Sequence, residues 1–338
     1  MCSRDCAISM VVPVHPEDPT LKYPFIHTEL IEPEKMVQRL AAEYFTGKFK
    51  FKGVASQTPS EATPQLHTLI RGWEYNEIDA IADHFVEDIR IGCRQFGKPN
   101  IVDIWLKTPA SVLRKLKTPD DVRMFCMKEG RECRLFSTGL ALHFMMDYVP
   151  GIGLKILDPS AGWGDRMIAA IIAGDKVAEY HGYDPNLALK PRYQDIIDRL
   201  DKSKKCIVIT EKFQIAQIVK DYYDLAITSP PYFDLEDYSK DADQSIVEFP
   251  TWELWIRNFY TKYLLNMRYG VRKGGVLIIY VSNYTVFVDG KKIIRNLEEE
   301  TVNILTKRAS GATLRLKGGL QTKPNDAPRP FFVFDVNE

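Results

Sequence analysis

Four consecutive residues in the second half of the chain have the chemistry to hold a flat amino group. They are Ser229, Pro230, Pro231 and Tyr232. Adjacent prolines fix their own φ angles and remove two N–H donors, which leaves rigid backbone carbonyls. The Ser229 oxygen and the Pro230 carbonyl could accept hydrogen bonds from an amino group, while the Tyr232 ring stacks on a flat base. In isolation these residues form only a turn, so their place in the fold decides what they mean.

A glycine-containing turn lies upstream, between a predicted strand and a predicted helix. Its sequence is Asp158-Pro159-Ser160-Ala161-Gly162-Trp163-Gly164. Glycine lets the backbone approach a ligand without a Cβ in the way, and the first N–H groups of the following helix favour an anion. Asp184 ends the next predicted strand, where a carboxylate can accept hydrogen bonds from ribose hydroxyls, and Glu211 ends the third. The pattern indicates a nucleoside site at the carboxyl edge of a parallel sheet.

The residues themselves leave the nucleoside open. A dinucleotide fingerprint needs Gly-x-Gly-x-x-Gly after the strand. Here Gly151-Ile152-Gly153 precedes the strand, and the sixth position is Ile156. NAD is therefore set aside. A Walker-type phosphate loop is also missing from the sequence.

The elements that must position these residues alternate after Pro150. Strands are predicted at 154–157, up to 184, 206–210, 224–228, 276–281, 312–316 and 331–336, and helices at 167–173, 187–200, 251–267 and 297–307. Strands separated by helices imply a parallel sheet covered on both faces, here with an antiparallel edge. The aromatic stripe of the helix at 251–267, which includes Tyr263, is interpreted as core packing. The fold class is α/β.

The first 130 residues are predicted to be mainly helical. Helices are expected at 34–45, from 76 to 93, and at 101–106, 110–116 and 120–128, with a loop at 57–64. We therefore divide the chain into a helical N-terminal region, 1–130, with a role in substrate recognition, and an α/β domain, 131–338.

Composition restricts the kind of protein. Lysine plus arginine and aspartate plus glutamate both number 45, which argues against binding nucleic acid mainly by bulk charge. A local basic stretch remains near the C-terminus, with Lys307, Arg308, Arg315, Lys317, Lys323 and Arg329. Six scattered cysteines form no Cys-x-x-Cys pair, so neither a metal site nor a disulfide framework is predicted. With no secretory signal and no apolar run of about 18 residues, we expect an intracellular, cytoplasmic protein that is neither secreted nor membrane-spanning.

Together the two motifs resemble a known family. Asp158 to Gly164 with Ser229 to Tyr232 is similar to the amino-methyltransferases that make N4-methylcytosine or N6-methyladenine in DNA. The longer stretches 180–186 and 229–238 resemble DNA methylases of phages and large DNA viruses, a resemblance compatible with phage or viral origin. It covers roughly residues 134 to 336. It implies a Rossmann-like S-adenosylmethionine-dependent methyltransferase fold, with a seven-stranded, mostly parallel sheet and an antiparallel edge.

The resemblance also implies roles for individual residues. The donor S-adenosyl-L-methionine would lie on the glycine turn, with Asp184 at its ribose and Glu211 or Phe213 near its adenine. The segment Phe136-Ser137-Thr138-Gly139 resembles an additional donor-binding motif, in which Thr138 caps the next helix and Phe136 packs on the donor. The implied donor-binding residues are Phe136, Thr138, Asp158, Ser160, Ala161, Gly162, Gly164, Asp184 and Glu211, and the implied catalytic residues are Ser229, Pro230, Pro231 and Tyr232.

The acceptor has several candidates. Ser229 in front of Pro-Pro favours cytosine N4 in DNA, with adenine N6 in DNA or RNA as the alternative. A protein glutamine amide ranks lower, because such enzymes usually carry Asn at this position, and a catalytically silent binding module would not need both motifs. Target recognition is expected from the N-terminal region, the loop 236–249 or the basic C-terminal stretch. The sequence leaves the oligomeric state and the recognition sequence open.

Overall fold

The structure of the chain is a computed structural model that describes residues 13–25, 32–46, 68–71, 78–95, 97–238, 243–288, 290–321 and 327–337. Its centre is an eight-stranded sheet with the strand order β3-β13-β14-β10-β8-β5-β6-β7. The strands are β3 (Thr68–Arg71), β5 (Leu154–Asp158), β6 (Val177–Tyr183), β7 (Cys206–Ile209), β8 (Tyr223–Thr228), β10 (Val271–Tyr280), β13 (Ala312–Gln321) and β14 (Arg329–Val336).

The sheet confirms the predicted fold class. Strands β10, β8, β5, β6 and β7 pair in parallel, and β14 runs antiparallel between β10 and β13, near one edge. The order in which β5 lies between β6 and β8 reverses the winding of the chain at that point, as in other Rossmann-like sheets. The structure adds an eighth strand, β3, parallel to β13. Its four residues lie in a region predicted to be helical, and such a short strand has too little periodicity to be recognised.

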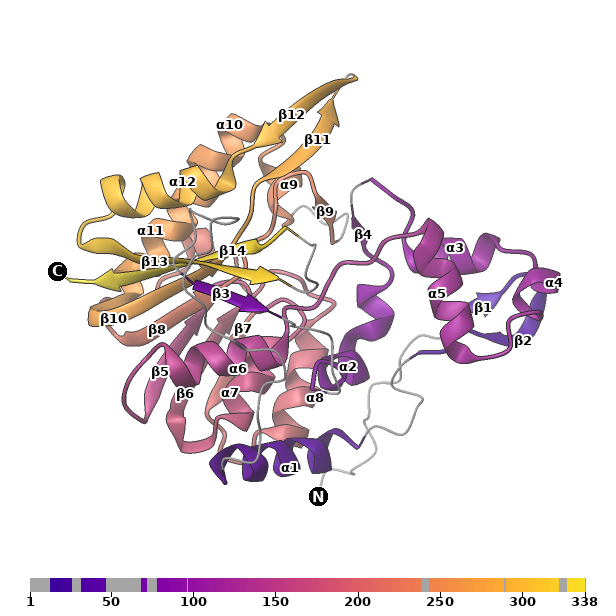
Figure 1. The fold of residues 1–338 in the computed structure, drawn as a ribbon, viewed down its shortest axis with the longest axis horizontal. Helices are drawn as coiled ribbons and strands as arrows, with labels where there is room; N and C mark the ends of the chain where they lie inside the picture. The colour runs from indigo at the N-terminus through magenta and orange to yellow at the C-terminus, as the bar shows by residue number, and fades with distance from the viewer. Residues whose placement is uncertain are drawn as a thin grey trace.

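Helices cover both faces of the sheet (Figure 1). Alternate strand residues face opposite sides, so Ile156 and Ile278 enter one core while Leu157 and Leu277 enter the other. The first core holds α1 (Pro33–Phe45), α2 (Ala80–Arg90), α6 (Thr138–Asp147), α7 (Asp165–Ile172) and α8 (Lys190–Leu200). The second holds α10 (Trp252–Leu254), a π-helix (Trp255–Tyr260), α11 (Thr261–Gly270), α12 (Leu297–Asn303) and a second π-helix (Ile304–Arg308). The helices predicted from 131 onward are confirmed.

A small lobe, residues 13–25 and 98–130, projects from the sheet-containing body (Figure 1). It contains β1 (Val14–His15), β2 (Asp18–Lys22), α3 (Ile101–Lys107), α4 (Ala110–Leu113) and α5 (Pro119–Glu129). Its core includes Tyr23, Phe25 and Trp105, each no more than 4% exposed. The helix α5 begins at a capping box in which Thr118 accepts from the Asp121 N–H and the Asp121 carboxylate accepts from the Thr118 N–H.

The helices predicted in the N-terminal region are confirmed, but the contacts of this region fall into two groups. The helices α1 and α2 pack against α7 and α8 of the body, and β3 joins the sheet, whereas β1, β2 and α3 to α5 form the lobe. The four strands of the region were not predicted. The loop expected at 57–64 lies outside the described residues, and the division at residue 130 stays a prediction.

Two further strand pairs lie outside the main sheet. A hairpin is formed by β11 (Tyr284–Val288) and β12 (Lys291–Arg295), and it was not predicted from the sequence. A short pair joins β4 (Arg94–Gln95) to β9 (Glu236–Asp237). The remaining elements are the short helix α9 (Ser245–Glu248) and 3₁₀ turns at Gly174–Lys176 and Phe213–Ile215. Within the residues that the structure describes, every helix is too short or too polar to cross a lipid bilayer.

Candidate active site

A cavity of about 840 Å³ opens at the carboxyl ends of the central strands. Its wall includes Gly162 after β5, Asp184 after β6 and Ser229 after β8. Residues of the lobe, such as Met124 and Met127 of α5, border the same space. The cavity therefore joins the two motifs of the sequence, because parallel strands bring their carboxyl ends to one edge of the sheet.

The glycine turn after β5 is held by one buried carboxylate. Asp158 is fully buried and accepts hydrogen bonds from Arg166 Nε at 2.8 Å, from the Tyr180 hydroxyl at 2.6 Å and from the Ser160 N–H at 3.2 Å. Arg166 also donates to the Ser160 carbonyl. Asp158 is absent from the cavity wall. In this structure it fixes the shape of the turn, and Ser160 and Gly162 present that turn to the cavity.

Two glycines of the turn adopt backbone conformations that other residues rarely reach. Their φ angles are 57° at Gly162 and 86° at Gly164. A Cβ on Gly164 would also lie 3.0 Å from Ile196 Cδ1 of α8. These positions therefore require glycine for the tight turn and for packing of the following helix. Ala161 and Gly164 lie behind the wall, outside the set of residues that line the cavity.

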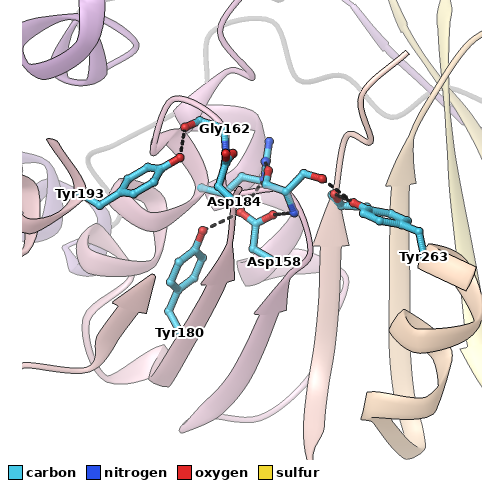
Figure 2. A network of polar contacts seen from close by, with 9 residues as sticks. Asp158, Gly162, Tyr180, Asp184, Tyr193 and Tyr263 are labelled. Atoms are coloured by element: carbon cyan, nitrogen blue, oxygen red, sulfur yellow. Dashed lines mark hydrogen bonds and ion pairs between the residues drawn. The ribbon is translucent and has the colours of Figure 1, made fainter. Parts of the chain in front are cut away.

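Asp184 connects the turn to the end of β6. Its carboxylate accepts from the Gly162 N–H at 2.9 Å and from the Asn186 N–H at 2.9 Å, and Tyr193 donates to the Gly162 carbonyl (Figure 2). Burial raises the pKa of Asp184 to about 6, although the two backbone N–H groups oppose the shift. Each carboxylate oxygen has a second lone pair. Asp184 can thus accept hydrogen bonds from a ligand while it keeps the turn in place.

The tetrapeptide Ser229 to Tyr232 borders the same cavity. Ser229, Pro231 and Tyr232 line it, whereas Pro230 is buried and absent from the wall. The Tyr232 hydroxyl accepts from the Ser282 N–H at 3.0 Å, and its ring meets the Tyr284 ring edge-on at 5.3 Å between centroids. Burial raises the pKa of Tyr232, so this phenol stays neutral. Tyr232 is held as a fixed flat wall beside Ser229.

Tyr263 joins the glycine turn after β5 to the end of β8, a contact that sequence reasoning missed. Its hydroxyl lies 2.8 Å from Ser160 Oγ and 2.7 Å from Thr228 Oγ1, as Figure 2 shows for the Ser160 side. The residue is 1% exposed and belongs to the core, as predicted, but its hydroxyl also reaches the cavity wall. Helical spacing identifies the buried face and says nothing about the atom at the end of the ring.

The segment before α6 is arranged differently from the prediction. Ser137, and not Thr138, is the N-cap, and its hydroxyl accepts from the Leu140 N–H at 3.4 Å. Asp79 accepts from the Ser137 hydroxyl at 2.9 Å and from the Thr138 N–H at 2.8 Å. The helix begins one residue earlier than a Thr138 cap requires, so Thr138 is buried inside the first turn. Phe136 lines the cavity.

Glu211 lies apart from the other predicted donor contacts. It is exposed and borders a separate hollow of about 310 Å³, together with Pro185 and Thr210. Phe213, the alternative named for the adenine side, is buried and lines the main cavity. Its ring packs edge-on against Tyr263 with 5.3 Å between centroids. The structure thus places Phe213, and not Glu211, on the main wall.

A group of buried carboxylates borders the cavity beside the turn. Asp83 forms a two-bond ion pair with Arg90, at 2.7 and 2.9 Å, yet burial raises its pKa to about 6. Asp165, at the start of α7, is 1% exposed, and within the described part of the chain its Oδ1 atom has no hydrogen-bond partner. Burial raises the pKa of Asp165, and the charges of Asp79 and Asp83 raise it further. Sequence reasoning did not predict this group, because its members come from separate elements.

Comparisons with known proteins are limited to structure. No protein-family model and no curated protein matches the chain. Solved structures that are similar include the tRNA m1G37 methyltransferase of M. jannaschii (16% identity, 59% of this chain and 49% of that chain, TM-score 0.37). The 1,6-didemethyltoxoflavin-N1-methyltransferase of Burkholderia thailandensis (14%, 60% and 78%, 0.41) and the N-methyltransferase NodS of Bradyrhizobium japonicum (10%, 60% and 94%, 0.39) are others.

The chain spans about half the length of the tRNA methyltransferase that it matches. At these identities and TM-scores the likeness adds nothing to the function, and the fold class rests on the strand order of the chain itself.

Proposed function

We propose that the chain transfers a methyl group from S-adenosyl-L-methionine to the exocyclic amino group of a nucleic-acid base, with cytosine N4 in intracellular DNA as the first candidate. The observation that carries the proposal is the shared cavity, which has Gly162 and Asp184 on one side and Ser229 and Tyr232 on the other. Tyr263 links the two sides through its hydroxyl. A nucleoside site and an amino-group site that face one space are what methyl transfer between two bound molecules requires.

The donor side fits a nucleoside with an amino acid attached. Asp184 would accept from the ribose hydroxyls, Phe213 would contact the adenine, and the backbone at Gly162 would face the methionine part. Bound there, S-adenosyl-L-methionine supplies an electrophilic methyl group on its sulfonium. Phe136 lies beside the turn with its ring 4.9 Å from the guanidinium carbon of Arg166, which is paired with Asp158, so this part of the wall offers an apolar ring over a buried ion pair.

The acceptor side would promote the reaction by positioning the amino group. The lone pair of a cytosine or adenine amino group is delocalised into the ring, so the nitrogen is a weak nucleophile. An N–H that donates to the Ser229 hydroxyl would favour the pyramidal nitrogen while Tyr232 stacks on the base. The Pro230 carbonyl is assigned no contact, because Pro230 is absent from the cavity wall. The nitrogen would form its new bond to the methyl carbon as the bond from that carbon to the donor sulfur breaks; the sulfur would leave as a neutral thioether, and the nitrogen would release its extra proton to water. A base in a duplex reaches the site only after flipping out, at a cost of a few kcal/mol.

Arginines at the mouth of the cavity support a polymer as the acceptor. Arg123, Arg131, Arg134 and Arg329 all line it. Burial and the nearby charge of Arg329 lower the pKa of Arg134. No carboxylate among the described residues lies within ion-pair distance of Arg134 or Arg329. Two arginines without a carboxylate partner on one wall favour an anion such as a phosphate.

The test is a transfer assay with labelled donor and three acceptors: unmethylated DNA, RNA and a protein mixture. We expect label in DNA, released as N4-methylcytosine after digestion to nucleosides. Label in N6-methyladenine would change the proposed target base from cytosine to adenine and keep amino-group methylation as the reaction. Label confined to protein, or calorimetry that detects no donor binding by the purified chain, would refute the proposal.

A further inference from the structure

The hairpin β11–β12 projects from the body (Figure 1), and Tyr284, its first residue, lines the cavity. Residues that pair directly across the two strands point to the same face, so Phe287 and Lys292 share a face with Thr285 and Ile294. This face is open: Phe287 is 74% exposed and Ile294 is 58% exposed. An exposed aromatic ring beside an exposed isoleucine is costly to keep in water unless something binds it.

The other face of the hairpin is fixed to the body through Asp234. The carboxylate accepts from the Tyr284 hydroxyl at 2.8 Å and from Arg295 Nη2 at 2.7 Å. The Arg295 guanidinium carbon also lies 4.9 Å from the centre of the Trp252 ring. Two strands alone are marginally stable in water, so these contacts explain why the hairpin keeps its position.

The same contacts connect the hairpin to the acceptor motif. Asp234 is two residues after Tyr232, and the Tyr232 ring packs against Tyr284 at the base of β11. Tyr284 also lines the cavity. Anything bound along the hairpin is therefore held at a fixed distance from Ser229.

The hairpin also carries charge that is not neutralised by the described residues. Lys291 and Lys292 are exposed, and no carboxylate in the described ranges lies within ion-pair distance of either. The remaining cation, Arg295, is used in the pair with Asp234. Because the whole chain is neutral, this concentration of positive charge beside the active-site cavity is a local feature. Lys292 pairs with Phe287 on the open face, and Lys291 lies next to it on the other face. Exposed lysines close to an exposed aromatic ring are complementary to a polyanion with flat bases.

We propose that the hairpin β11–β12 binds the DNA that flanks the methylated base, with Lys291 and Lys292 at phosphates and Phe287 against a base or in a groove. The inference rests on the proposed function and adds an element for engaging the target. Strand pairs that enter a groove and apolar side chains that pack between bases are both established ways of binding DNA. The hairpin follows β10, outside the regions from which the sequence led us to expect recognition.

The experiment measures binding of the full chain to a fluorescein-labelled 25-base-pair DNA duplex at several salt concentrations. The double variant Lys291→Ala, Lys292→Ala should bind more weakly, and the slope of log affinity against log salt should fall by about 2. Phe287→Ala should weaken binding roughly 5- to 100-fold with little change in slope. Each variant should bind S-adenosyl-L-methionine as the wild type does, which shows that the fold is intact.

Matched controls lie at the amino ends of the strands, opposite the carboxyl ends where the cavity opens. Lys202 and Lys220 are exposed before β7 and β8, and Tyr269, at the end of α11, is 47% exposed. Their alanine variants should bind the duplex normally. Wild-type affinity in the hairpin variants, with DNA methylation intact, would overturn this inference and leave the proposed function standing. Failure of the wild type to methylate any base would overturn both.

Discussion

The two sides of the cavity are built in different ways. On the donor side, buried hydrogen bonds hold the backbone: Asp158 accepts from three groups, and Asp184 accepts from the N–H groups of Gly162 and Asn186. The polar atoms that shape this side are therefore used internally, and the ligand meets mainly backbone, aromatic rings and the remaining lone pairs of Asp184.

On the acceptor side, the reactive position is left open. Ser229 makes no hydrogen bond to any described residue, while its neighbour Tyr232 is held by Ser282. The two sides therefore have different tasks. Buried polar groups determine the shape of the donor side. On the acceptor side, the Ser229 hydroxyl is free to bind the acceptor next to the fixed ring of Tyr232. Changes on the donor side should cost stability, whereas changes on the acceptor side should cost rate.

The largest expected effect is on the donor side, at Asp158. Asp158→Asn leaves the Arg166 guanidinium buried without its carboxylate, which should lower the free energy of unfolding by about 3–5 kcal/mol. Urea unfolding followed by circular dichroism measures the loss. Asp198→Asn on the exposed face of α8 is the control and should change stability by less than about 0.5 kcal/mol. Equal stability of the two variants would contradict a structural role for the buried pair.

On the acceptor side, Ser229→Ala should leave stability and donor affinity unchanged and lower kcat by roughly 10²-fold, because the amino group loses the hydrogen bond that positions it. Steady-state kinetics on DNA and calorimetry with the donor separate the two quantities. Ser203→Ala, in an exposed turn between α8 and β7, is the matched control and should behave as the wild type. A Ser229→Ala variant with normal kcat would remove Ser229 from the mechanism.

The pH dependence of donor binding tests Asp184 directly. Its pKa is raised to about 6, so the carboxylate takes up a proton as the pH falls through 6 and accepts fewer hydrogen bonds. Donor affinity should therefore fall by up to about tenfold per pH unit below 6. The stability that this group contributes has the opposite sign: a raised pKa favours the folded state at low pH, and this contribution is lost as the pH rises through about 6.

Calorimetry between pH 5 and 8 measures the effect. Asp184→Asn should bind the donor weakly at every pH and show a flatter profile. An unchanged profile in Asp184→Asn would assign the titration to another group, such as Asp83, whose pKa is also raised to about 6.

The fold of residues 131–338 could be predicted because its elements are long and regular. Strand β10 ends in the continuous apolar run Val276–Tyr280, and α8 and α11 carry apolar residues at helical spacing, which burial on two sheet faces requires. The hairpin β11–β12 was missed in this way, although Asp289-Gly290 between two apolar stretches is a sequence signal for a hairpin. Its exposed Phe287 and Ile294 disturb the alternation expected of a strand with one buried face, since this element projects from the body.

Some site residues could likewise be predicted from the sequence, and others could not. Glycines, prolines and the carboxylates at strand ends are recognisable because each residue type has a local reason for its position, as at Gly162 and Asp184. Tyr263 and Asp165 act through partners far away in the sequence, and a single sequence contains no record of such contacts. Thr138 was assigned the cap that Ser137 provides, because both are good caps and helix ends vary by one residue.

The smallest expected effect concerns the link between the two sides, and two tyrosines of one helical stretch test it. Tyr263 bonds to Ser160 and Thr228 at the cavity, whereas the Tyr260 hydroxyl bonds to Thr301 Oγ1 at 2.6 Å, away from the cavity wall. Each Tyr→Phe change removes one buried hydroxyl, so both should cost about 1–2 kcal/mol of stability. Only Tyr263→Phe should also slow methyl transfer, by about threefold to tenfold. If Tyr260→Phe slowed it equally, the loss would reflect stability alone, and the two sides of the cavity would need no link beyond the sheet that carries them.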